Sequence, residues 1–168
     1  MSGPSRPEPV EAVRARRDRA LDRLLGAVPY VQLLGVGFDR RGDELTAVMP
    51  FGEHLIGNPM LPALHGGATA SFLETAALVE LSWTWLWDEM EAGRFAGEGA
   101  EMPRLPRTID FTVDYLRTGL PRDAYARARV NRLGRRYASV HVEAWQDRRD
   151  RLFAAATGHF MMPQRTAP

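Results

Sequence analysis

Residues 64–81 read LHGGATASFLETAALVEL and carry the strongest structural pattern of the chain. From Gly67 to about Trp87, apolar side chains at helical spacing cover nearly the whole circumference and not a single stripe. A helix that is apolar on all sides must be buried. Glu74 and Glu80 interrupt the run, so it lacks the uninterrupted apolar length of a membrane span. The sequence therefore predicts a central helix enclosed by the rest of the chain.

Segments on both sides of this helix alternate between apolar and polar residues, which is the period of a strand. Glu44–Met49 precedes the helix, after a turn-like Arg41-Gly42-Asp43. Four more alternating runs follow it, at residues 108–115, 124–131, 137–146 and 152–162. Consecutive strands with short connections predict an antiparallel meander. The fold class is α+β, with a curved antiparallel sheet wrapped around one helix.

The N-terminal part predicts an amphipathic surface helix that starts at Val10 and ends near Gly26 and Pro29. Acidic residues interleave with its arginines, which favours a solvated face over a nucleic-acid-binding arm. We expect residues 1–9 to be a flexible tail with no secretory signal, 10–162 a single domain and 163–168 a second tail. Residues 88–107 break both periodicities and predict a long connection.

The composition excludes several chemistries. All 22 basic residues are arginines and 21 residues are acidic, so the net charge of +1 gives no broad attraction to nucleic acid. Without lysine there is no Schiff base and no phosphate loop of the Walker type. Without cysteine there are no disulfides or thiolate metal sites, which fits the cytoplasm. The four histidines lack metal-ligand spacing, and no cofactor is expected.

Glu74 is the first candidate for chemistry, because a charged carboxylate on an apolar helix is costly to bury alone. One interpretation is structural: a hydrogen bond or ion pair to a strand residue, or a rotation of the helix that leaves Glu74 at the surface. The other is functional, with Glu74 as a nucleophile or general base.

His65, Gly66 and Gly67 stand directly before the helix. The start of a helix presents free N–H groups and a dipole that favours negative charge, and glycines let a ligand oxygen approach closely. A histidine here is more often structural than a ligand or base. Glu74 follows two to three turns later, so the pair suggests an oxyanion donor beside a carboxylate.

The runs at residues 64–68 and 72–76 resemble the hotdog-fold acyl-CoA thioesterases of the phenylacetate-pathway and 4-hydroxybenzoyl-CoA type. In those proteins an HGG motif opens the central helix and an Asp or Glu follows at this spacing. The resemblance extends from about residue 28 to 162, and residues 109–117 are similar to the strand after the helix. It implies a hotdog fold and hydrolysis of acyl-CoA to a carboxylic acid and CoA.

The resemblance also implies roles for individual residues. The Gly66 N–H would polarise the thioester carbonyl, and Glu74 would be the catalytic carboxylate, either as general base or as nucleophile through a mixed anhydride. His65 and Gly67 complete the substrate-binding loop, with His65 fixing it through hydrogen bonds. Family members usually carry Asn or Gln where this chain has Pro59, so we expect the neighbouring Asn58 to take that role. Some members also have a hydroxyl one turn after the carboxylate, where this chain has Leu78.

Coenzyme A carries phosphate groups, and we expect these to be bound by Arg132, Arg135 and Arg136 around Gly134. A solvated hairpin turn is the alternative for these arginines.

An open sheet edge favours pairing with a second copy. The resemblance implies a homodimer or homotetramer with active sites shared between subunits. A non-catalytic acyl-CoA-binding or structural hotdog protein is the competing interpretation of the whole chain; a hydratase is disfavoured because no G-H-x-P signature is present.

Overall fold

The computed structural model describes residues 8–93, 102 and 104–164. Its helices and strands, in chain order, are α1 (Val10–Gly26), α2 (Pro29–Leu34), β1 (Gly37–Arg41), β2 (Glu44–Met49), the 3-10 helix η1 (Glu53–Leu55), α3 (Gly66–Glu91), β3 (Arg107–Tyr115), β4 (Ala124–Leu133), β5 (Tyr137–Trp145) and β6 (Leu152–Met161). The strands form one antiparallel sheet in the order β1-β2-β4-β5-β6-β3.

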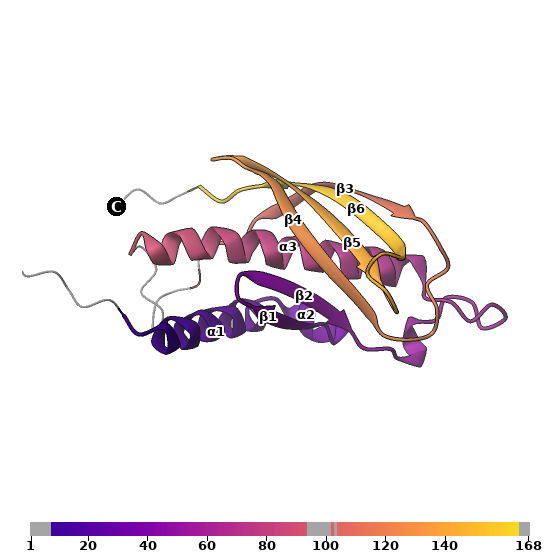
Figure 1. The fold of residues 1–168 in the computed structure, drawn as a ribbon. Coiled ribbons are helices and arrows are strands. Elements are labelled where there is room, and N and C mark those ends of the chain that lie inside the picture. The colour runs from indigo at the N-terminus through magenta and orange to yellow at the C-terminus, as the bar shows by residue number, and fades with distance from the viewer. Residues whose placement is uncertain (1–7, 94–101, 103, 165–168) are drawn as a thin grey trace, which may run out of the picture.

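Helix α3 lies across the sheet and α1 lies on the other side of α3 (Figure 1). Both sides of α3 are therefore covered, which explains why its sequence is apolar all round. Phe72, Leu73 and Ala76 pack into the core formed with the sheet. Val79 and Trp83 pack into a second core together with α1. The prediction of a buried central helix inside a curved antiparallel sheet is confirmed, and the arrangement is the hotdog fold.

One feature of the predicted topology is wrong. The four strands after α3 do not form one meander, because β3 pairs with β6 and not with β4. Only β4, β5 and β6 are joined as a meander. Residues 116–123 carry the chain from β3 across the end of the sheet to β4. The Gly119 carbonyl on this connection accepts a hydrogen bond from Leu64 N–H (2.9 Å), and Leu116 and Arg117 N–H both donate to the Phe153 carbonyl.

The predicted helix at Val10–Gly26 and the predicted strand at Glu44–Met49 are present with those bounds. The short helix α2 and the strand β1 are additional elements. Helix α3 continues to Glu91, so the 88–107 connection begins later than predicted. Most of that connection, and most of the tails expected at 1–9 and 163–168, lie outside the described residues.

The sheet is incompletely paired in two places. Strand β3 has neighbours on one side only, and its Ile109 and Tyr115 are more than half exposed, as is Leu116 directly after it. Strands β2 and β4 pair through just three residue pairs, from Ala47↔Ala126 to Met49↔Ala124. The sheet therefore has an open edge at β3 and a short, weak seam between β2 and β4.

Candidate active site

The start of α3 is fixed by His65, which is the N-cap residue. Its ring atom Nδ1 accepts a hydrogen bond from the Gly67 N–H (2.9 Å), and its backbone carbonyl accepts from Thr69 N–H (3.0 Å). Its own N–H donates to the Leu55 carbonyl (2.8 Å). Because Nδ1 acts as an acceptor, the proton of the neutral ring sits on Nε2. His65 thus has the bonding of a structural residue that shapes the loop.

Gly66 is the first residue of α3, and its N–H makes no hydrogen bond to any residue in the described part of the chain. Its carbonyl accepts a hydrogen bond from the Tyr115 hydroxyl (2.8 Å). A Cβ at this position would lie 3.3 Å from that hydroxyl oxygen, which is a tight contact. The Gly66 N–H is therefore a free donor at the positive end of a long helix.

Glu74 is half-buried on α3, and its Oε1 accepts a hydrogen bond from the Thr108 hydroxyl on β3 (2.7 Å). A hydrogen bond to a strand residue is one of the structural interpretations that the sequence left open. No other described residue hydrogen-bonds to this carboxylate. One oxygen is thus anchored while Oε2 remains available to a substrate or a water molecule.

Gly66 and Glu74 face the same strand. Tyr115 contacts Gly66 at one end of β3, and Thr108 contacts Glu74 near the other. Eight residues separate the two positions, so they are about 80° apart around the helix and about 12 Å apart along it. Within a single protomer that distance is too long for both groups to touch one carbonyl carbon.

Asn58 lies in the exposed loop between η1 and α3. The base of this loop is closed by the bridge Ile56↔Leu64 and by the bond from Gly57 N–H to the Ala63 carbonyl. The Asn58 Oδ1 accepts from Met60 N–H (3.0 Å), so its carbonyl serves the loop while its amide N–H₂ makes no bond to a described residue. Asn58 therefore lies in the loop that leads into the HGG turn, with its side-chain oxygen hydrogen-bonded within that loop.

The three arginines proposed for coenzyme A lie around the β4–β5 turn, and all three are exposed. The register connects this turn to the Thr108 end of the sheet, through Leu133↔Ala138 and Phe160↔Thr108. The Gly66 end of the site is at the opposite end of β3. Within one protomer the structure does not bring Arg132, Arg135 and Arg136 next to Gly66.

The sequence does not predict the contact of Thr108 with Glu74 or that of Tyr115 with Gly66. Thr108 and Tyr115 both belong to the run that was predicted as a strand, but their contacts with α3 depend on β3 lying at the edge beside β6, which the periodicity does not reveal. The Thr108 hydroxyl lies beside the Glu74 carboxylate, whereas Leu78, one turn after Glu74 on the helix, has no hydroxyl.

Two further observations limit the chemistry. Within residues 8–93, 102 and 104–164, no three His, Cys, Asp or Glu residues are grouped so as to hold a metal ion. No helix of that same part is long and apolar enough to cross a bilayer.

The chain matches known families and structures. Residues 57–161 match the family described as the acyl-CoA thioesterase N-terminal domain. A protein of Chromobacterium violaceum is 33% identical over 92% of this chain and 98% of that one, with a TM-score of 0.61.

Two more distant structures share the fold. A protein of Shewanella oneidensis related to the thioesterase superfamily is 24% identical over 94% of this chain and 100% of that one, with a TM-score of 0.67. The Escherichia coli PaaI protein from the phenylacetic acid degradation operon is 15% identical over 90% and 96%, with a TM-score of 0.68. No curated protein matches the sequence significantly. Because the family match spans residues 57–161 and so includes the HGG turn, Glu74 and Thr108, the chain belongs to the acyl-CoA thioesterase family.

Proposed function

We propose that this protein hydrolyses an acyl-CoA thioester at a site formed by Gly66 of one copy and Glu74 of another. One observation carries the proposal: the Gly66 N–H at the start of α3 and one oxygen of the half-buried Glu74 carboxylate, neither hydrogen-bonded to a described residue, both lie beside the strand that ends the sheet. Family membership makes a thioester the substrate class that this pair serves.

The geometry supports a site shared between two copies. Gly66 and Glu74 of one protomer are about 12 Å apart along the helix, so one carbonyl cannot reach both. The exposed edge of β3 carries the apolar side chains Ile109 and Tyr115. If two copies pair along this edge about a two-fold axis, the Gly66 end of one meets the Glu74 end of the other. A homodimer is therefore the smallest active unit, and a homotetramer is two such units.

In this site the Gly66 N–H donates to the thioester oxygen, which becomes an oxyanion when the tetrahedral species forms. Such a donor typically contributes about 3 kcal/mol. Glu74 acts in one of two ways. As a general base it takes a proton from a water molecule, whose oxygen then bonds to the carbonyl carbon. As a nucleophile it bonds to that carbon itself, and water later hydrolyses the mixed anhydride. In both routes the C–S bond breaks, the thiolate takes a proton, and a carboxylic acid and CoA leave.

The remaining residues support these two. His65 and Gly67 hold the turn that presents the Gly66 N–H. The free amide of Asn58 is suited to orient the thioester or the water. Arg132, Arg135 and Arg136 carry exposed positive charge that suits the phosphates of CoA. The route requires no metal ion and no cofactor.

The test is the release of free thiol from a panel of aromatic and medium-chain acyl-CoAs by the full chain. We expect kcat to fall at least about a hundredfold in Glu74→Ala and in Glu74→Gln, because both remove the base or nucleophile. Glu91→Gln, at the exposed end of the same helix, is the matched control and should retain activity.

Equal turnover by the wild type and both Glu74 variants would remove Glu74 from the mechanism. Saturable acyl-CoA binding with no turnover by the wild type would identify a binding protein in place of an enzyme.

A further inference from the structure

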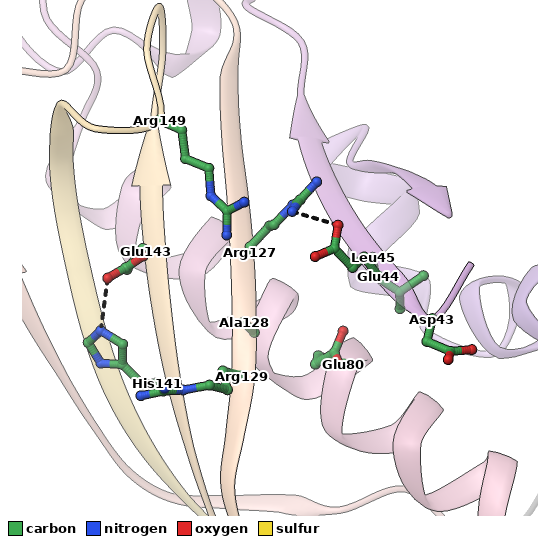
Figure 2. Close-up of a pocket in the computed structure, with 10 residues that line it drawn as sticks. All are labelled: Asp43, Glu44, Leu45, Glu80, Arg127, Ala128, Arg129, His141, Glu143 and Arg149. Carbon is green, nitrogen blue, oxygen red and sulfur yellow. Dashed lines mark ion pairs between the residues drawn. The ribbon is translucent and has the colours of Figure 1, made fainter. Parts of the chain in front are cut away.

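A cavity lies where the seam between β2 and β4 ends. The two strands are paired from Met49↔Ala124 to Ala47↔Ala126 and then separate. The space between them has a volume of about 370 Å³, within the range of sites that hold small organic ligands. Figure 2 shows its lining residues, which are Asp43, Glu44, Leu45, Glu80, Arg127, Ala128, Arg129, His141, Glu143 and Arg149. None of them belongs to the Gly66–Glu74 site.

The floor of the cavity is the carboxyl group of Glu80. This residue is on α3, and its side chain lies between the two separating strands (Figure 2). Burial raises its pKa to about 7, and no neighbouring cation offsets that shift. No described residue pairs with it or hydrogen-bonds to it. An acid that faces a cavity without a partner provides a place for a cation or an N–H donor.

Two of the lining residues, Leu45 and Ala128, are apolar, and the other eight are charged or polar. Leu45 of β2 and Ala128 of β4 point to the inner face of the sheet, since each alternates with an outward-facing arginine or carboxylate neighbour. On the outer face, Arg127 bridges the separated strands by bonding to Glu44 Oε2 (2.8 Å) and to Thr46 Oγ1 (2.9 Å). Arg127 is therefore neutralised and holds the mouth in shape.

Arg149, in the β5–β6 turn, is different. It forms no ion pair with a carboxylate in the described part of the chain, and its guanidinium lies 5.7 Å from the centre of the Trp145 ring. Figure 2 shows its side chain extending from that turn toward Arg127 and the mouth of the cavity. Among the described residues, the cavity thus has an acid without a partner at its floor, the two apolar side chains of Leu45 and Ala128 beside it, and Arg149 without a carboxylate partner at its rim; Arg129 also lines it.

We propose that this cavity binds a small dipolar molecule, an ω-amino carboxylic acid, with its ammonium group on Glu80, its methylene chain between Leu45 and Ala128, and its carboxylate on Arg149. Each end meets the opposite charge, and the chain covers these two apolar side chains. The site is separate from thioester hydrolysis and binds a ligand of another chemical class.

The test is an NMR titration of the full-length protein with 6-aminohexanoate at pH 8, where Glu80 is ionised and the amine is still charged. The backbone amides of residues 43–45 and 127–129 should shift in a saturable way. Hexylamine and hexanoate, which each carry one end of the ligand, should bind at least about tenfold more weakly.

Matched variants assign the two ends. Glu80→Gln should weaken 6-aminohexanoate binding at least about tenfold, and Glu91→Gln should not change it. Arg149→Ala should weaken 6-aminohexanoate similarly but leave hexylamine unaffected, and Arg151→Ala in the same turn is its control. A thermal melt of Glu80→Gln shows that the variant is folded.

Three results would overturn the proposal: no saturable shift at these amides, undiminished binding to Glu80→Gln, or equal binding of hexylamine and 6-aminohexanoate. Thiol release plays no part in this readout, so its failure leaves the proposed thioesterase activity untouched.

Discussion

At the scale of single residues, the carboxylate of Glu74 on α3 is held by a hydrogen bond from the Thr108 hydroxyl on β3. A carboxylate on an apolar helix is conspicuous because burying it alone is costly. Its partner Thr108 lies 34 residues later and looks like any other polar residue of an alternating strand. Likewise, the HGG turn can be predicted from local rules of helix capping, whereas the contact of Tyr115 with Gly66 depends on tertiary structure. Local chemistry is predictable from the sequence; long-range partners are not.

In the proposed mechanism, Thr108 positions the carboxylate of Glu74. Thr108→Val keeps the shape of the side chain and removes the hydroxyl that donates to Oε1. A hydrogen bond to a charged group contributes about 1.5–3 kcal/mol, so we expect kcat to fall about tenfold or more while KM stays within about twofold. Thr108→Ser should recover most of the activity because it restores the donor. Steady-state thiol release measures both constants; unchanged kcat in Thr108→Val would show that the carboxylate needs no anchor.

At the scale of elements, periodicity predicts the strands and helices well but not their neighbours. The alternation at 108–115 is the same whether β3 pairs with β4 or with β6. The connection 116–123 is long enough to allow the crossing, and the bond of the Gly119 carbonyl to Leu64 N–H fixes it. The arginines of α1 are predicted to face solvent. Arg17 departs from this prediction, because its guanidinium stacks 3.3 Å from the centre of the Trp87 ring.

Helix α3 carries one titratable group that should link stability to pH. Burial raises the pKa of Glu80 from 4.5 to about 7, so the folded state binds its proton more tightly than the unfolded state does. Between pH 4.5 and 7 the folded protein therefore holds more protons, and its stability falls as the pH rises. The contribution of Glu80 to this fall is about 3 kcal/mol at most.

Urea unfolding at pH 5, 6, 7 and 8, at one protein concentration, measures this dependence. The groups around Glu80 also titrate or carry charge: Asp43 and Glu44 on β2, Arg127 and Arg129 on β4, His141 and Glu143 on β5, and Arg149. Their effects cancel in the difference between the wild type and Glu80→Gln. We expect that difference to grow in favour of the variant as the pH rises from 5 to 8, and Glu91→Gln to follow the wild type. Parallel curves for wild type and Glu80→Gln would show that the carboxyl is well solvated.

At the scale of the whole molecule, one chain has a complete core but only part of the proposed site. The side chains of α3 are enclosed by the sheet and by α1, so the protomer needs no partner to bury its apolar helix. What remains open is the edge of β3, where Gly66 and Glu74 both face outward at a separation of about 12 Å along the helix. The proposed mechanism therefore requires two copies, whereas the fold of one chain does not.

Complementation between two inactive variants tests whether the site is shared. Gly66→Pro removes the donor N–H at the first position of a helix, where proline is well tolerated, and His65 already has the extended conformation that proline requires of the preceding residue. Glu74→Ala removes the carboxylate. Each homodimer should be inactive. A heterodimer, however, contains one site with the intact Gly66 of one chain and the intact Glu74 of the other.

Co-expression of the two variants with different affinity tags allows the heterodimer to be purified. Thiol release by that heterodimer should reach about half the wild-type rate per dimer, since one of its two sites is intact and the other lacks both groups. Gly66→Ala, which keeps the N–H and adds only a methyl group near the Tyr115 hydroxyl, is the control for crowding at this position. Recovery is possible only when the two groups act across the interface; a heterodimer as inactive as its parents would place each site within one chain, in conflict with the 12 Å separation along α3.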